Sequence, residues 1–174
     1  YKLRRLQNSL NARIITSIIH PSLIAKALKT ADVVIGAMHS ETGRTPIIVT
    51  EDMIKQMKMG SVIIDVSIDQ GGCFETSRVT THTEPVFTKH NVIHYCVPNI
   101  ASRVARTASY ALSNIFGPLL VRVGEEGGIE NLIKKDIGLR NGVYMYNGIL
   151  TNEYISQQFN IPFQNIDLLL AAFH

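Results

Sequence analysis

Apolar residues follow two different spacings along the first hundred residues, and these spacings alternate. Apolar side chains three or four positions apart are typical of amphipathic helices, whereas short continuous apolar runs are typical of buried strands. Helices are predicted from the first spacing for residues 1–11, 21–30 and 50–59. Strands are predicted from the second for residues 12–19, 32–37, 61–68 and 91–96. The chain therefore alternates helices and strands, as α/β proteins do.

The predicted strands lack the alternation of apolar and polar residues that a sheet with one solvated face would have. In residues 61–68 the apolar positions are nearly continuous: Val62, Ile63, Ile64, Val66 and Ile68. Strands that are apolar on both faces are usually covered by helices on both sides, which is characteristic of parallel sheets. We therefore expect an α/β fold built on a parallel sheet.

The pattern changes after residue 104, where helices dominate. Shorter helices are predicted for residues 129–136 and 152–159. The apolar residues 166–173 leave two interpretations open, a frayed end or a segment that packs on a partner. One long helix is predicted for residues 105–123, because these side chains fall on one side of it: Ala108, Leu112, Ile115, Leu119 and Leu120.

Composition narrows the class of protein. The 174 residues are 45% hydrophobic, which is enough for a substantial core. The net charge of +3 is spread along the chain with no Lys/Arg block longer than a pair, so a nucleic-acid partner is not expected. No apolar run approaches the roughly 18 residues of a membrane-spanning helix. The sequence begins at Tyr1 with neither an initiator Met nor a signal-peptide core, and we expect it to be a fragment of a longer chain.

Cysteine and histidine spacing predicts no metal site. Cys73 and Cys96 form no C-x-x-C pair. His90 and His94 are four residues apart, but they flank a predicted strand and would not share a helical face. Two isolated cysteines favour a reduced, cytoplasmic compartment.

Three polar or Gly-containing segments follow the predicted strands, at residues 38–39, 68–72 and 97–99. Ligands of open parallel sheets bind outside the carboxyl ends of the strands, so these segments are the candidate cofactor site, although ordinary turns have a similar composition. Asp69 is the principal candidate, because its carboxylate follows an apolar strand and precedes a pair of glycines where a ligand can approach the backbone. A helix or turn cap is the alternative role for Asp69.

Phosphate-binding glycines are missing from the sequence. A dinucleotide-binding domain has a G-x-G-x-x-G motif after its first strand, and no such motif is present in these 174 residues. The Gly-rich residues 124–128 follow a predicted helix rather than a strand, so they are rejected as a phosphate-binding loop.

Residues 60–75, with the sequence GSVIIDVSIDQGGCFE, resemble the most characteristic segment of the alanine dehydrogenase family. The resemblance continues, in the family's order and spacing, to about residue 163. Further matching segments are TTH at 80–82, HYCVPN at 94–99, RTAS at 106–109 and LTNE at 150–153. The related NAD-binding subunit of proton-translocating transhydrogenase shares the family's fold but usually differs at residues 68–70.

The resemblance implies an α/β fold with an incomplete doubly wound, Rossmann-type parallel sheet, followed by C-terminal helices that pack on a catalytic domain missing from this chain. Residues 1–104 would form a partial NAD-binding domain without its first two strands, and residues 105–174 a helical part of the catalytic domain. The family's reaction is the reversible oxidative deamination of L-alanine to pyruvate and ammonia, in a homo-oligomer that is commonly a hexamer. The family's substrate-binding Arg and Lys and its acid/base His lie in the N-terminal part, so we expect the fragment alone to be inactive.

The resemblance also implies roles for individual residues. Asp69 would be the catalytic residue beside the nicotinamide and the substrate, Asn99 would lie close to it, and Lys2 would lie near the adenosine ribose. Other cofactor-binding residues would come from the strand ends: Met38, His39, Val66, Ser67, Ile68, Val97, Pro98 and Ile100. The chain departs from the family at Ile19, where a Ser is common, and at residues 39–42, so the adenine side is expected to differ.

Two alternative functions remain open. The chain could be part of a transhydrogenase NAD-binding subunit, or a non-catalytic binding or assembly module with the same fold. The sequence upstream of residue 1 would distinguish them, because it would contain or lack the G-x-G-x-x-G motif and the catalytic Lys and His.

Overall fold

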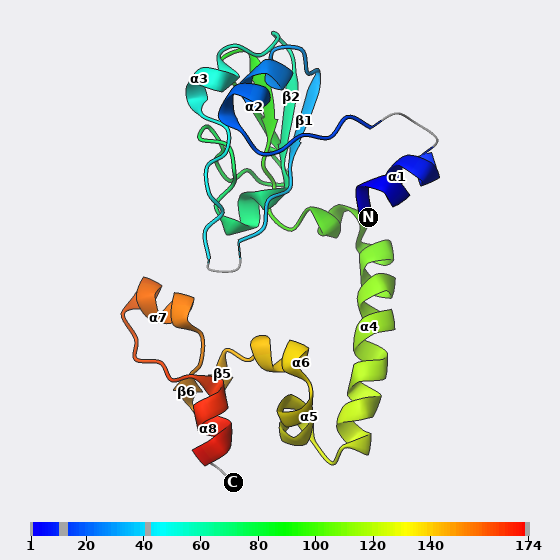
Figure 1. Ribbon diagram of the computed structural model, residues 1–174, viewed down its shortest axis with the longest axis vertical. Helices are drawn as coiled ribbons and strands as arrows, with labels where there is room; N and C mark the ends of the chain where they lie inside the picture. Colours follow the sequence, from blue (N-terminus) through cyan, green and yellow to red (C-terminus); the bar gives the residue numbers. More distant parts are fainter. Residues whose placement is uncertain (1, 11–13, 41–42, 173–174) are drawn as a thin grey trace. The chain divides into compact units, whose positions relative to one another are not determined.

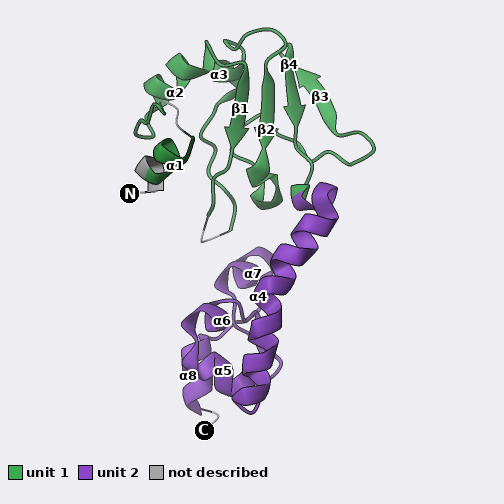
Figure 2. Ribbon diagram, turned by 90° about the vertical axis from the view of Figure 1, so that its right-hand side faces the viewer, with its two compact units in different colours: residues 1–100 green, residues 101–174 purple. Residues whose placement is uncertain are grey.

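The computed structural model describes residues 2–10, 14–40 and 43–172, with side chains from residue 5 onward. The chain divides into two compact units, residues 1–100 and residues 101–174 (Figure 2). Each unit has its own group of buried apolar residues.

A four-stranded sheet forms the centre of the first unit (Figure 1). Its strands are β1 (Val33–Gly36), β2 (Val62–Asp65), β3 (Val86–Lys89) and β4 (Val92–Tyr95). In the spatial order β1-β2-β4-β3, β2 runs parallel to both β1 and β4, whereas β3 is antiparallel to β4. The predicted Rossmann-like α/β fold is confirmed, with a sheet that is parallel except for the antiparallel edge strand β3.

Helices cover one face of this sheet. Helix α2 (Pro21–Leu28) starts with proline at its first turn, and the short α3 (Glu51–Ile54) is capped by the Thr50 side chain, which accepts from Met53 N. Their apolar side chains join one core with residues of β2, β4 and the following loop: Leu28, Ile54, Met57, Ile63, Phe74 and Val92. Burial of these side chains attaches the helices to the sheet.

The opposite face of β1 differs from the prediction. Val33 and Ile35, which alternate with core-facing positions along this strand, are 56% and 63% exposed. Continuous apolar runs predicted cover on both faces, but within the described residues helices pack on one face only. Strand β1 therefore has more apolar side chains than this unit buries.

The strand predicted for residues 12–19 is wrong over the part that the structure describes. Residues 14–19 have no strand structure, and Ile15, Ile18 and Ile19 are exposed; residues 11–13 lie outside the described residues. An apolar run becomes a strand only when a neighbouring strand takes up its backbone hydrogen bonds. The preceding helix α1 (Lys2–Leu10) agrees with the prediction.

Two further predictions need correction in this unit. The strand predicted for residues 61–68 ends at Asp65 and continues as a 3₁₀ helix, η1 (Val66–Gln70). The helix predicted for residues 50–59 is regular only in α3 and then becomes turns up to Gly60, whose φ is +79°. The strand ends where the Asp65 side chain caps η1, and the predicted helix ends at the left-handed backbone of Gly60.

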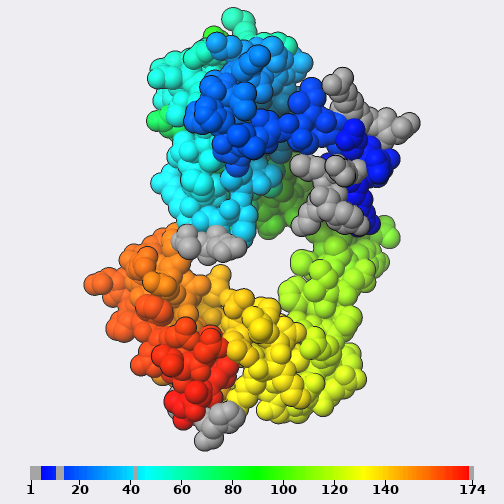
Figure 3. Space-filling model, viewed as in Figure 1, coloured from blue at the N-terminus to red at the C-terminus, as the bar shows by residue number. Residues whose placement is uncertain are grey.

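The second unit is mainly helical. After η2 (Ile100–Val104), α4 (Ala105–Glu125) confirms the predicted long helix even though Pro118 lies inside it. None of the described side chains of α4 is buried, and the helix is visible along one side of the space-filling view (Figure 3). The remaining elements are α5 (Ile129–Lys135), α6 (Ile137–Asn141), β5 (Met145–Tyr146), β6 (Ile149–Leu150), α7 (Glu153–Phe159) and α8 (Ile166–Ala172).

Helix α8 packs on its own unit, so the frayed end that was one interpretation of residues 166–173 is wrong for the described part, up to Ala172. Leu169 and Leu170 are buried with Ile133 of α5 and Tyr146 of β5. Arg140 reinforces this contact, because its guanidinium donates to Asp167 Oδ1 at 2.8 Å and to the carbonyl of Ile133 at 3.1 Å. The C-terminal apolar segment is therefore part of this core.

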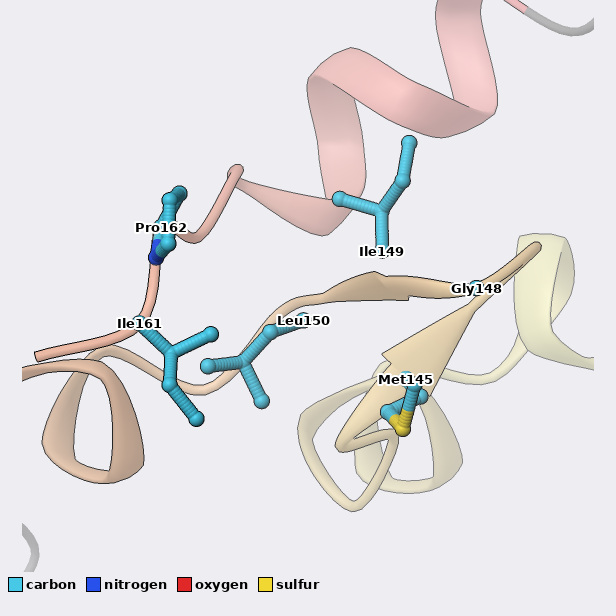
Figure 4. Close-up of a pocket in the computed structure, with 6 residues that line it drawn as sticks. All are labelled: Met145, Gly148, Ile149, Leu150, Ile161 and Pro162. Carbon is cyan, nitrogen blue, oxygen red and sulfur yellow. The ribbon is translucent and has the colours of Figure 1, made fainter. Parts of the chain in front are cut away.

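A shallow apolar pocket lies beside the β5–β6 hairpin, with a volume of about 380 Å³ (Figure 4). The side chains that line it are aliphatic or small, and no charged group is among them. They belong to the hairpin and to the segment after α7: Met145, Gly148, Ile149, Leu150, Ile161 and Pro162. The pocket offers apolar contact but no group for acid–base or electrostatic chemistry.

Candidate functional site

The carboxyl ends of β1, β2 and β4 meet at one edge of the sheet, because these strands are parallel (Figure 2). Backbone and side-chain hydrogen bonds connect the segments that follow them. Met38 N donates to Ser67 Oγ at 2.7 Å, and Asn99 N donates to Asp69 Oδ1 at 3.0 Å. The three segments singled out in the sequence are therefore neighbours in space.

The turn that contains Asp69 forms because both of its ends are capped. Asp65 starts η1 by accepting a hydrogen bond from Ser67 N at 3.0 Å. Gly71 ends it with a φ of +93°, while its N–H donates to the carbonyl of Ile68 at 2.9 Å. Asp69 lies between the caps, so its exposed carboxylate is held on a short, well-defined turn. It does not cap η1 itself.

Asp65 is the residue that sequence reasoning missed. Its side chain is 2% exposed, and besides Ser67 N it accepts from Cys73 N at 3.1 Å and from Ser77 Oγ at 2.6 Å. A Cβ atom on Gly72 would lie 2.5 Å from Asp65 Oδ2, so glycine is required there. An aspartate inside an otherwise apolar strand was the available signal, since a buried carboxylate must find donors.

A second set of contacts joins Gln70 to the segment after β1. Gln70 Oε1 accepts from Ser40 N at 3.2 Å, and Gln70 Nε2 donates to the carbonyl of Ser40 at 3.1 Å. The Gln70 carbonyl accepts from Thr45 N at 2.8 Å. The segment around residues 38–45, of which 41 and 42 lie outside the described residues, is thus attached to the turn that contains Asp69.

His94 has a structural role under the same edge. Its ring is completely buried and stacks on Phe87, with the ring centroids 4.7 Å apart. Nδ1 lies 3.0 Å from the carbonyl of Val92, so it carries the hydrogen, and Nε2 accepts from the Thr76 hydroxyl at 2.7 Å. Burial lowers the pKa of His94, because desolvation disfavours the imidazolium. The ring is therefore neutral and unavailable to a substrate.

The predicted cofactor-binding residues fall into two groups. Ser67, Ile68 and Val97 have buried side chains, so a ligand could reach them mainly through the backbone. More accessible side chains are those of Met38, His39, Val66, Asp69, Pro98, Asn99 and Ile100. Lys2 belongs to α1, and its side chain lies outside the described residues.

Residues 2–10, 14–40 and 43–172 contain neither a metal-binding cluster nor a membrane-spanning helix. The described residues contain no group of three His, Cys, Asp or Glu side chains that could hold a metal ion. None of the helices in the described ranges is long and apolar enough to cross a membrane. Cys73 and Cys96 are free and buried, and burial raises the pKa of the Cys73 thiol to about 11.

The arrangement can bind a polar, partly cationic group at the sheet edge. Asp69 supplies one exposed carboxylate, oriented by the backbone of Asn99. Val66 and Ile100 add partly exposed apolar surface on two of the connected segments. A fixed carboxylate next to apolar surface can order a cation or a carboxamide beside a flat ring.

Comparison with known proteins relates this geometry to one family. The chain is 39% identical over 167 residues to alanine dehydrogenase 2 of Staphylococcus aureus (strain USA300), an alignment that covers 95% of this chain and 45% of that protein. A solved L-alanine dehydrogenase structure superposes with a TM-score of 0.76 and 34% identity, covering 91% of this chain and 44% of that one. A transhydrogenase from Sinorhizobium meliloti superposes with a TM-score of 0.56 and 28% identity, over 67% of this chain and 33% of that one.

The chain spans about half of the length of the alanine dehydrogenases that it matches. The family model described as alanine dehydrogenase/PNT, C-terminal domain, matches residues 1–153, which is most of the sequence. This match includes the whole sheet, the turn with Asp69 and α4. The chain therefore belongs to the alanine dehydrogenase/PNT C-terminal domain family.

Proposed function

We propose that this chain is part of an NAD-dependent alanine dehydrogenase, in which L-alanine, NAD⁺ and water give pyruvate, ammonium, NADH and a proton, reversibly. The identity of 39% with an alanine dehydrogenase over nearly the whole chain supports this choice of reaction. The observation that carries it is the exposed Asp69 carboxylate, held at the carboxyl edge of a parallel sheet by Asn99 N. Dinucleotides and their substrates bind at this edge in α/β sheets.

The residues at this edge fit NAD as the cofactor. The left-handed backbone of Gly71 ends the turn on which Asp69 is exposed, and Val66 offers an apolar surface to a flat ring. We assign cofactor contacts to Met38, His39, Val66 to Asp69 and Val97 to Ile100, and to Lys2 on the adenosine side. NAD supplies the hydride acceptor when it is bound.

Asp69 is proposed as the catalytic residue that orients the reacting groups. The substrate is an ammonium or iminium cation during parts of the reaction, and a carboxylate fixed at hydrogen-bond distance stabilises that charge. The backbone N–H of Asn99 keeps Asp69 Oδ1 in one direction and leaves its other oxygen for a ligand. The acid/base step is assigned to residues of the parent protein outside these 174.

The two domains expected from the sequence have different proposed roles. Residues 1–104 are assigned to a partial NAD-binding domain and residues 105–174 to the helical part of the catalytic domain. We further propose a cytoplasmic homo-oligomer, a hexamer as commonly found in the family, with L-alanine or pyruvate as the small-molecule partner. Size-exclusion chromatography of the full-length protein with light scattering would measure the oligomeric state.

The proposed reaction is tested on the full-length parent protein. NADH formation is followed at 340 nm with L-alanine and NAD⁺, and in the reverse direction with pyruvate, ammonium and NADH. We expect alanine-dependent activity in both directions. Absence of this activity, together with NADPH-to-NAD exchange in a membrane complex, would support the transhydrogenase alternative. Absence of both activities would support a non-catalytic module.

A further inference from the structure

Asp65 connects both ends of the turn that contains Asp69. Ser67 N donates to Oδ1 at 3.0 Å from the start of that turn, and Cys73 N donates to Oδ2 at 3.1 Å from the segment after it. Ser77 Oγ donates to Oδ2 at 2.6 Å. One carboxylate therefore closes the segment 66–73 into a loop whose two ends cannot move independently.

Asp65 is too deeply buried to bind a ligand directly. Its side chain is 2% exposed, so neither substrate nor cofactor can touch it. Hydrogen bonds to a carboxylate are roughly twice as strong as those between neutral groups, and the short distance to Ser77 Oγ is typical of such bonds. Gly72 leaves the space that this carboxylate occupies, since a Cβ there would lie 2.5 Å from Oδ2.

We propose that Asp65 is a positioning residue for Asp69: by holding Ser67 and Cys73 at fixed places, it sets the direction in which the Asp69 carboxylate meets its ligand. This inference rests on the proposed function, because the ligand of Asp69 is the reacting substrate and cofactor. It goes beyond that function by giving the buried aspartate of the same segment a defined role. Asp65 acts through Asp69 and takes no part in the chemical step.

A purely structural role is the competing explanation, and a double-mutant cycle separates the two. A residue that acts only through Asp69 loses its effect when Asp69 has already been neutralised, whereas a general stabilising residue costs the same factor in both backgrounds. The variants are Asp65→Asn, Asp69→Asn and the double variant in the full-length enzyme. Asp52→Asn is the matched control, since Asp52 is exposed and its side chain pairs with Lys55 on the surface.

In the Asp65→Asn variant an amide NH₂ group, which cannot accept a hydrogen bond, replaces one carboxylate oxygen. It faces the backbone N–H of Ser67 or Cys73, and the two opposed donors displace the loop. A displacement of about 1 Å at a reacting group costs on the order of 100-fold in rate. We expect kcat/KM for alanine to fall about 100-fold through kcat, with the KM for NAD changed less than about threefold. In the Asp69→Asn background the same substitution should cost less than about threefold. Equal losses in both backgrounds would overturn the proposal.

Ser77 provides a milder variant if Asp65→Asn fails to fold. Ser77→Ala removes one of the hydrogen bonds to Asp65, and Ser77→Thr restores a hydroxyl at the same place. We expect kcat to fall about tenfold for Ser77→Ala and to return to within about threefold of the parent for Ser77→Thr. Equal activities of the two variants would contradict the proposal.

A measurement that does not depend on enzyme activity tests the positioning role separately from the proposed reaction. The Asn99 amide donates to Asp69 Oδ1, so its hydrogen exchange reports the position of the Asp69 carboxylate. Exchange at Asn99 should accelerate at least about tenfold in Asp65→Asn and remain unchanged in Asp52→Asn. Accelerated exchange in a protein without alanine-dependent activity would refute the proposed reaction alone; unchanged exchange in an active enzyme would refute the positioning role alone.

Discussion

Replacement of Asp69 by Asn tests whether its charge is used in chemistry or only in structure. The isosteric side chain keeps one carbonyl oxygen, which can still accept from Asn99 N at the present 3.0 Å. The exposed position means that no buried group loses a partner, so the fold and the melting temperature should remain nearly unchanged. What disappears is the unit negative charge facing the ligand. Removal of one preorganised electrostatic partner costs about 100-fold or more in kcat, equivalent to about 2.7 kcal/mol of transition-state stabilisation.

The assay measures kcat/KM for L-alanine in the full-length enzyme, together with thermal unfolding of the same preparation. We expect at least a hundredfold loss of kcat/KM with a melting temperature within about 2 °C of the parent. Asp52→Asn removes an exposed aspartate whose side chain pairs with Lys55, and it should change neither quantity. Near-normal turnover with a lowered melting temperature would remove Asp69 from the catalytic residues and leave it a structural one.

Three further predictions concern the chain itself. The 174-residue polypeptide should bind NAD weakly, because its sequence contains no G-x-G-x-x-G motif for the pyrophosphate; micromolar affinity by calorimetric titration would contradict this. Burial lowers the pKa of His94 below its ordinary 6.5, so the unfolded state binds the extra proton. Stability should therefore fall as the pH drops below about 6.5, by at most about 1.4 kcal/mol per pH unit from this group, and His94→Gln should reduce the slope in urea titrations at several pH values. Leu169→Ala should lower the free energy of unfolding of the second unit by about 2–4 kcal/mol, because Leu169 is only 4% exposed. Leu168→Ala, at a position that is 70% exposed, should lower it by less than about 0.5 kcal/mol. Similar losses for the two variants would mean that α8 is not packed as described.

Much of the local structure follows from signals within a few residues of each element. The long helix α4 was predicted to within two residues at its end, because the spacing of its apolar residues is a local property that persists across Gly117 and Pro118. Asn152 caps α7 through its side chain, as its position before that helix indicates. The parallel strands β1 and β2 were recognisable from their nearly continuous apolar residues, and β4 was predicted by the same reasoning despite His94 and Tyr95.

Two hairpins were missed, although one carried a clear signal. Asn147-Gly148 joins β5 to β6, both residues have positive φ, and this dipeptide is the commonest sequence of a two-residue hairpin turn. His90 and Asn91, with φ of +54° and +60°, join β3 to β4 in the same way but have a less distinctive sequence. The four residues of β3 form a strand because β4 pairs with them, not because of their own pattern.

The sequence alone determined the α/β class, the order of the main elements and the segments that meet at the carboxyl edge of the sheet. Only the tertiary structure decided which of two aspartates is exposed. Asp65 and Asp69 are four residues apart in one segment, yet Asp65 is buried by donors from residues 67, 73 and 77, while Asp69 is turned outward by η1. The partners of Asp65 lie 2, 8 and 12 positions along the chain, an irregular spacing that no periodic pattern of the sequence reveals. Residues 14–19, although apolar, form no strand because strand formation depends on pairing with another segment, which the run itself does not specify.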